Sequence, residues 1–90
     1  MYKAILITTK GCEGCRIMSN ILKKSISLSD KDITLEVLDC KDKQSREYID
    51  KYKIEDFPAT FLEKNDEVTF IWTGTYPEPV VSRWFSLYMK

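Results

Sequence analysis

The stretch TTKGCEGCRIM, residues 8–18, decides how this chain of 90 residues is organised. It carries two cysteines, Cys12 and Cys15, between two different hydrophobic patterns. The apolar run YKAILIT before the pair is typical of a strand at 2–8 that is covered on both faces. After the pair, apolar residues recur at helical spacing, which predicts a helix from Cys12 to about residues 27–29. The sequence therefore places the cysteine pair at a junction between a strand and a helix.

Beyond residue 30, the hydrophobic pattern predicts three more strands and two more helices. The last two strands flank a pair of residue types that favour tight turns, which indicates a hairpin. Pro79 suits the start of the final helix. The expected elements are a strand at 33–39, a helix near 44–53, strands at 59–64 and 67–73 around Asn65 and Asp66, and a helix within 77–90.

The order of these elements, βαβαββα, predicts an α/β fold. A strand–helix–strand unit normally forms a right-handed crossover between parallel neighbours, whereas the closing hairpin is antiparallel. A four-stranded mixed sheet with helices on both faces follows. We expect one domain over residues 1–90, because a chain of this length forms a single core.

Composition narrows the classes of partner and compartment. The 14 basic and 14 acidic residues cancel, so net charge favours neither nucleic acid nor an anionic membrane. No apolar stretch reaches the roughly 18 residues of a membrane span, and the first residues lack a signal-peptide pattern. We therefore expect a cytoplasmic protein without nucleic-acid or membrane partners. We also expect it to be a monomer. In a reducing compartment, cysteine pairs tend to be catalytic or metal-binding.

The spacing of the two cysteines suits thiol chemistry. The reactive form of a thiol is the thiolate, and the unpaired N–H groups at a helix N-terminus stabilise it. Cys12 occupies that position and is expected to be the more exposed thiol. Cys15 lies one turn later on the same side, within the reach of a disulfide. Cys12 can therefore attack an external disulfide, and Cys15 can resolve the mixed intermediate.

Two other interpretations of the pair stay open at this point. Both cysteines could be inert core residues, which is common for a single cysteine. Alternatively, two soft thiolates on a strand–helix loop could carry copper(I) or zinc. A zinc site normally uses four ligands, and the chain has no histidine and only one further cysteine, Cys40.

Four features of the chain together resemble the thioredoxin and glutaredoxin group. They are CEGC after the first strand, DFPATFL at 56–62, WTG at 72–74, and the order of the elements. The resemblance departs from the group in detail. Leu6 stands where thioredoxins have a buried acid, Gly11 where they have a tryptophan, and the glutathione-gripping Thr-Val-Pro and Gly-Gly stretches of glutaredoxins are absent.

The resemblance implies a thioredoxin-like fold and a thiol–disulfide oxidoreductase that reduces or exchanges protein disulfides. It implies that Cys12 and Cys15 are catalytic, and that Phe57, Pro58 and Gly74 line the substrate groove, with Pro58 in the cis form. Electrons would come from a reductase or from glutathione. No resident cofactor or metal is expected under this interpretation.

Overall fold

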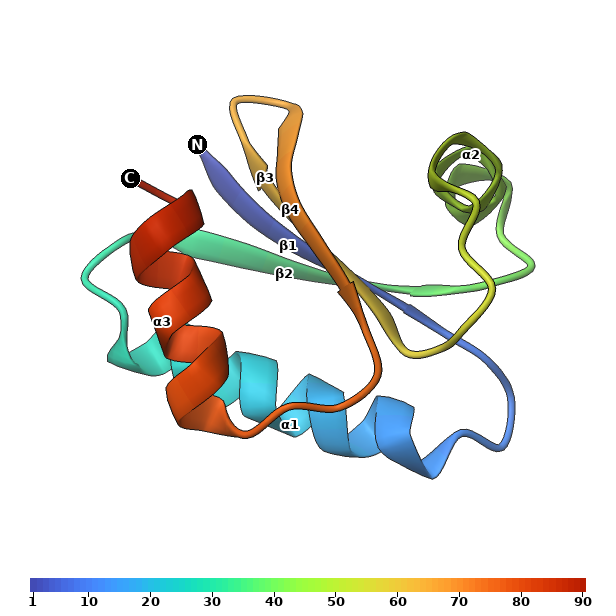
Figure 1. The fold of residues 1–90 in the computed structure, drawn as a ribbon, viewed down its shortest axis with the longest axis horizontal. Coiled ribbons are helices and arrows are strands. Elements are labelled where there is room, and N and C mark those ends of the chain that lie inside the picture. The colour runs from blue at the N-terminus through green and yellow to red at the C-terminus, as the bar shows by residue number, and fades with distance from the viewer.

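The computed structural model describes residues 1–90 and contains seven elements in the expected order (Figure 1). The predicted bounds are close to those observed: the first helix begins at Glu13, one residue after the predicted start, because Cys12 caps it. The elements are β1 (Tyr2–Thr8), α1 (Glu13–Leu28), β2 (Ile33–Asp39), α2 (Lys43–Tyr52), β3 (Ala59–Lys64), β4 (Glu67–Thr73) and α3 (Glu78–Tyr88).

The four strands form one mixed sheet in the order β2-β1-β3-β4, which confirms the predicted fold class. β1 pairs in parallel with β2, and Thr8 lies opposite Asp39 at the carboxyl ends of both strands. β1 also pairs antiparallel with β3, and Ile7 lies opposite Ala59 at the start of β3. The loop after β1, which carries the cysteines, therefore leaves the sheet beside the segment that carries Pro58.

Helices cover both faces of the sheet, with α1 and α3 on one face and α2 on the other (Figure 1). The centre of β1 contributes to both layers, because successive side chains of a strand point to opposite faces. Ala4 and Leu6 belong to the core cluster under α1 and α3, whereas Ile5 and Ile7 belong to the cluster under α2. All four side chains are 0% exposed, as the uninterrupted apolar run predicts.

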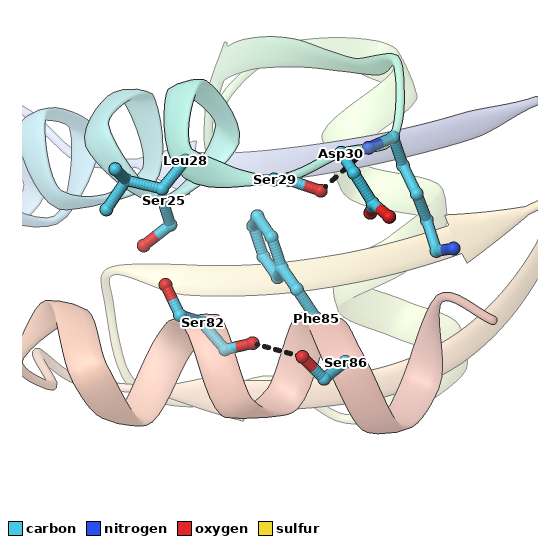
Figure 2. A pocket seen from close by; sticks show the side chains of 8 residues that line it. Ser25, Leu28, Ser29, Asp30, Ser82, Phe85 and Ser86 are labelled. Carbon is cyan, nitrogen blue, oxygen red and sulfur yellow. Dashed lines mark hydrogen bonds between the residues drawn. The ribbon is translucent and has the colours of Figure 1, made fainter.

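The final helix presents the broad apolar face that its sequence indicates. Val81 and Phe85 are buried in the core cluster shared with α1, and Figure 2 shows the Phe85 ring pointing from α3 toward α1. Next to them, the ring of Tyr88 stacks on Phe70 of β4 with ring centroids 4.1 Å apart. The helix thereby anchors the strand that leads back to the cysteine pair. None of the three helices combines the length and the apolar character needed to cross a membrane.

Candidate functional site

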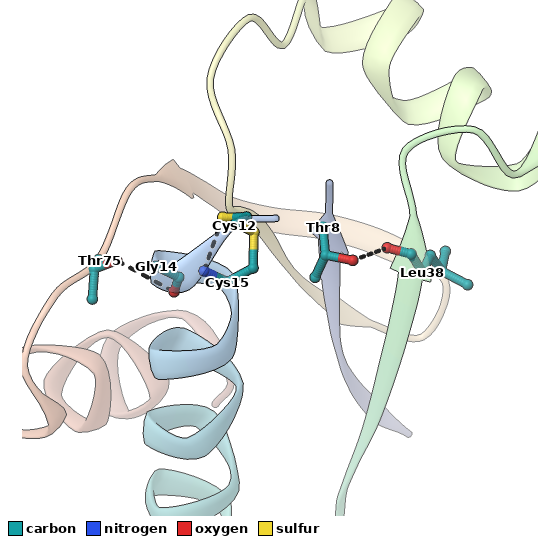
Figure 3. The surroundings of a disulfide bond; sticks show 6 residues. All are labelled: Thr8, Cys12, Gly14, Cys15, Leu38 and Thr75. Atoms are coloured by element: carbon teal, nitrogen blue, oxygen red, sulfur yellow. Dashed lines mark hydrogen bonds between the residues drawn. A yellow bond between two sulfur atoms is a disulfide. The ribbon is translucent and has the colours of Figure 1, made fainter. Parts of the chain in front are cut away.

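The cysteine pair lies where the chain passes from β1 into α1. Gly11 has a φ of +73°, a left-handed backbone conformation that residues other than glycine rarely adopt. This turn delivers Cys12 to the N-cap position of α1, where the backbone is extended. The Cys12 Sγ accepts a hydrogen bond from the Cys15 backbone N–H, with an N···S distance of 3.0 Å (Figure 3). The sulfur thus takes up one of the donors that every helix N-terminus leaves unpaired.

Cys12 and Cys15 are joined by a disulfide, with their Cα atoms 5.2 Å apart (Figure 3). The two sulfurs differ in accessibility. Cys12 is half-buried, whereas Cys15 is only 4% exposed beneath the first turn of α1. The prediction that Cys12 is the more exposed cysteine is confirmed. Because a large substrate can reach only an exposed sulfur, this difference favours Cys12 as the attacking residue.

Pro58 lies against the first turn of α1. The Phe57–Pro58 peptide bond is cis, as the resemblance implies. A Cβ built on Gly14 would lie 3.5 Å from Pro58 Cδ, so the proline lies beside the helix residue that separates the two cysteines. Gly74, with φ of +88°, donates its N–H to the Pro58 carbonyl at 2.8 Å. Sequence positions 12–15, 58 and 74 therefore converge on one end of the sheet.

The side chain of Phe57 lies on the α2 side of the sheet. It packs against the core cluster under α2, which contains Ile5, Ile7, Ala59 and Phe61. Its ring is therefore committed to the α2 face, although its backbone leads into Pro58. The role of Phe57 in binding a substrate stays a prediction.

Two charged residues of the first helical turn neutralise each other. Glu13 and Arg16 form an ion pair across one helical turn, and both side chains are exposed. The hydrogen bond and the charge of Arg16 hold the pKa of Glu13 below its usual value. The guanidinium of Arg16 is thus occupied by Glu13, so it is not a free cation for the Cys12 sulfur.

An open groove of about 560 Å³ runs along α1 toward the edge strand β2. Cys12 and Cys15 lie at one end of it, and Val37 of β2, which is half exposed, forms part of its wall. Pro58 and Gly74 do not line this groove. The open approach to the disulfide therefore runs along α1, whereas Pro58 is buried beside the first turn of this helix.

Cys40 lies near the same end of the sheet without joining the pair. Its backbone N–H donates to the Thr8 carbonyl at 2.7 Å, which places it at the carboxyl end of β2 as expected. Its side chain is a free thiol that packs against the core cluster under α2. No group of three or more His, Cys, Asp or Glu side chains is arranged to hold a metal ion.

Two further residues could not be predicted from the sequence, Thr75 beside the site and Glu63 farther along β3. Thr75, directly after Gly74, brings its hydroxyl oxygen to 3.5 Å from the Gly14 carbonyl oxygen (Figure 3). Glu63 on β3 is only 6% exposed, and its carboxylate accepts a hydrogen bond from the Tyr48 hydroxyl. Thr75 directly follows Gly74, a predicted site residue, and this position was the one indication in the sequence that Thr75 lies close to the site. Nothing in the pattern of β3 distinguishes Glu63 from a solvated residue.

Comparison with known proteins identifies the fold. No protein-family model matches the sequence, and no curated protein matches it. Solved structures, in contrast, do match this chain. A malarial protein superposes with a TM-score of 0.78 at 16% identity, covering 100% of this chain and 99% of that one. Thioredoxin-2, a component of the malaria parasite protein secretion machinery, gives a TM-score of 0.79 at 17% identity, over 97% of this chain and 82% of its own.

A third similar structure is an uncharacterized thioredoxin-like protein from Clostridium perfringens. It has a TM-score of 0.83 at 12% identity, with 98% of this chain and 71% of that chain covered. At such identities the likeness concerns the fold, and the activity has to be argued from the site. Together with the βαβαββα order and the Cys12–Cys15 pair after β1, these matches show that the chain has a thioredoxin-like fold.

Proposed function

We propose that the protein is a thiol–disulfide oxidoreductase that reduces or exchanges protein disulfides through Cys12 and Cys15. The observation that carries this proposal is the asymmetry of the pair. The half-buried Cys12 sulfur accepts a backbone N–H at the start of α1, while its partner Cys15 is shielded. A helix N-terminus stabilises a thiolate at the accessible position, which is what nucleophilic attack requires.

The reaction proceeds in two exchanges. The Cys12 thiolate attacks one sulfur of the substrate disulfide, so that a mixed disulfide forms and the other substrate sulfur leaves as a thiolate. The Cys15 thiolate then attacks the Cys12 sulfur, which closes the Cys12–Cys15 disulfide and releases the second substrate thiolate. The substrate gains two electrons and the cysteine pair loses two. A reductase or glutathione returns them in a separate exchange.

Pro58 and Gly74 support a protein substrate. Pro58 is buried beside Gly14, which lies between the two cysteines, and Gly74 donates its N–H to the Pro58 carbonyl. We propose that the backbone around these two residues holds a segment of the substrate near Cys12. The Glu13–Arg16 ion pair adds no net charge beside the attacking sulfur. We propose that the protein acts as a monomer in the cytoplasm, where a reductant for the pair is available.

The metal-carrier hypothesis uses the same two sulfurs, as thiolates bound to copper or zinc. It gives no reason for a proline held against the pair, whereas a groove for a substrate backbone does. An oxidoreductase forms a mixed disulfide with its substrate, whereas metal carriage does not require one. One experiment can therefore separate the two functions.

The test is capture of a mixed disulfide with a defined substrate. A Cys15→Ser, Cys40→Ser double variant retains Cys12 as its one thiol. This variant is mixed with native, disulfide-bonded insulin. We expect mass spectrometry to find insulin chains linked to Cys12, because no second thiol can release them. A matched Cys12→Ser, Cys40→Ser variant should capture far less. Equal capture by the two variants, or none by either, would contradict the proposal.

A further inference from the structure

The hydroxyl of Thr75 reaches the backbone between the two cysteines. Thr75 belongs to the loop between β4 and α3, yet its Oγ1 lies 3.5 Å from the Gly14 carbonyl oxygen and donates to it (Figure 3). A Cβ built on Gly14 would lie only 3.1 Å from this same Oγ1. The absence of a side chain at Gly14 therefore leaves the space that the Thr75 hydroxyl needs.

The peptide group that Thr75 contacts is the one that serves Cys12. The Gly14 carbonyl and the Cys15 N–H belong to the same amide. That N–H donates to the Cys12 Sγ at an N···S distance of 3.0 Å. A continuous chain of hydrogen bonds thus runs from the Thr75 hydroxyl through one amide to the reactive sulfur. Hydrogen bonds in such a chain polarise one another, because a donor on the carbonyl makes the N–H a stronger donor.

We propose that Thr75 is a positioning residue that favours the thiolate of Cys12 by donating to the Gly14 carbonyl. The inference rests on the proposed function only for the role of this thiolate as the attacking nucleophile. It also explains the glycine of the CEGC motif, because a side chain at position 14 would occupy the space of the Thr75 hydroxyl.

The size of the effect follows from the strength of the bond that is modulated. A hydrogen bond to a charged group strengthened by roughly 10–30% changes the thiolate population by about 1.3- to 4.6-fold. We therefore expect Thr75→Val, which replaces the hydroxyl by a methyl group of similar shape, to slow alkylation of Cys12 about twofold at low pH.

The experiment measures alkylation of Cys12 by iodoacetamide from pH 4 to pH 9. The background is Cys15→Ser, Cys40→Ser, in which Cys12 is the one thiol. Thr75→Val should move the midpoint of the profile to higher pH without lowering the plateau at high pH. Thr75→Ser should restore the original profile, because it restores the hydroxyl. Thr69→Val is the matched control, since the Thr69 hydroxyl also donates to a backbone carbonyl, that of Leu62, at 3.2 Å.

The proposal is overturned if Thr75→Val leaves the midpoint where it was, if Thr75→Ser shifts the midpoint as far as valine does, or if Thr69→Val shifts it equally. A fall in rate by the same factor at every pH would also overturn it, because that result reports access to the sulfur and not its ionisation. Thermal unfolding of each variant shows that it is folded. Alkylation needs no disulfide substrate, so this test can succeed even if insulin is never captured, and it can fail while capture succeeds.

Discussion

Tyr48→Phe probes the one buried carboxylate of the core layer under α2. The Tyr48 hydroxyl on α2 donates to the carboxylate of Glu63 on β3, which is 6% exposed. None of the three ion pairs of the structure includes Glu63. Phenylalanine keeps the aromatic contact with Phe61, whose ring centroid lies 4.9 Å from that of Tyr48. The substitution therefore removes the hydroxyl donor and little else.

The loss should be large for a single oxygen atom. A hydrogen bond to a charged group contributes about 1.5–3 kcal/mol, and a buried acceptor left without its donor costs about 1–3 kcal/mol. We expect Tyr48→Phe to lower the free energy of unfolding by about 2 kcal/mol at pH 7. For a domain of this size, that corresponds to a fall in Tm of roughly 8–16 °C.

Urea denaturation of four variants measures the effect. Tyr52→Phe is the matched control, because Tyr52 lies on the same helix and also packs on Phe61, with centroids 5.6 Å apart. It should cost much less than Tyr48→Phe. In a Glu63→Gln background, the cost of Tyr48→Phe should fall by more than half, since the charged acceptor is gone. Equal costs for the two tyrosines, or an unchanged cost in the Glu63→Gln background, would refute the reasoning.

The same pair makes stability depend on alkaline pH. Burial first, and then the Glu63 carboxylate, raise the pKa of Tyr48 above its ordinary value of 10.0. The folded protein therefore holds the phenolic proton at a pH where the unfolded chain releases it. The stabilisation is complete below pH 10 and is lost as the pH rises above 10. In Tyr48→Phe, the free energy of unfolding, measured by urea denaturation, should therefore fall less steeply above pH 10 than in the wild type. The same slope of free energy against pH in both proteins would contradict this.

Three substitutions around the cysteine pair give further predictions. Glu13→Gln removes a carboxylate and frees Arg16, so Cys12 should be alkylated faster below pH 7, and 0.5 M NaCl should reduce the difference; a slower reaction would contradict this. Gly14→Val should lower the urea midpoint, because a Cβ at this position already lies 3.1 Å from a neighbouring oxygen; an unchanged midpoint would show that the site has room. Gly11→Ala, at φ of +73°, should cost about 1–2 kcal/mol in the same assay, and a stabilised variant would refute the argument from strain.

The sequence was sufficient to predict the layers of the fold. The unbroken apolar run from Ala4 to Ile7 requires cover on both faces, and helices on either side of β1 provide it. The change from this run to helical spacing at the CEGC motif placed Cys12 within one residue of its observed position at the helix start. These are local patterns, and local patterns are what a single sequence records.

Contacts between distant segments could not be predicted in the same way. The position of β3 beside β1 depends on which edge the hairpin joins, and both edges of a two-stranded unit are available to it. Thr75 and Gly14 are 61 residues apart, and only the packed sheet brings them together. Glu63 is buried because α2 crosses over it and supplies the hydroxyl of Tyr48, a relation that no alternation of apolar residues reveals.

The most direct test of the central claim is the reduction of insulin with dithiothreitol as the electron source. Reduced insulin precipitates, so turbidity reports the rate at which its disulfides are opened. The proposed mechanism predicts that the wild-type protein shortens the lag before precipitation and that Cys12→Ser behaves like dithiothreitol alone. A wild-type lag equal to that of dithiothreitol alone, or a Cys12→Ser variant as active as wild type, would contradict the assignment of Cys12 as the attacking thiol of an oxidoreductase.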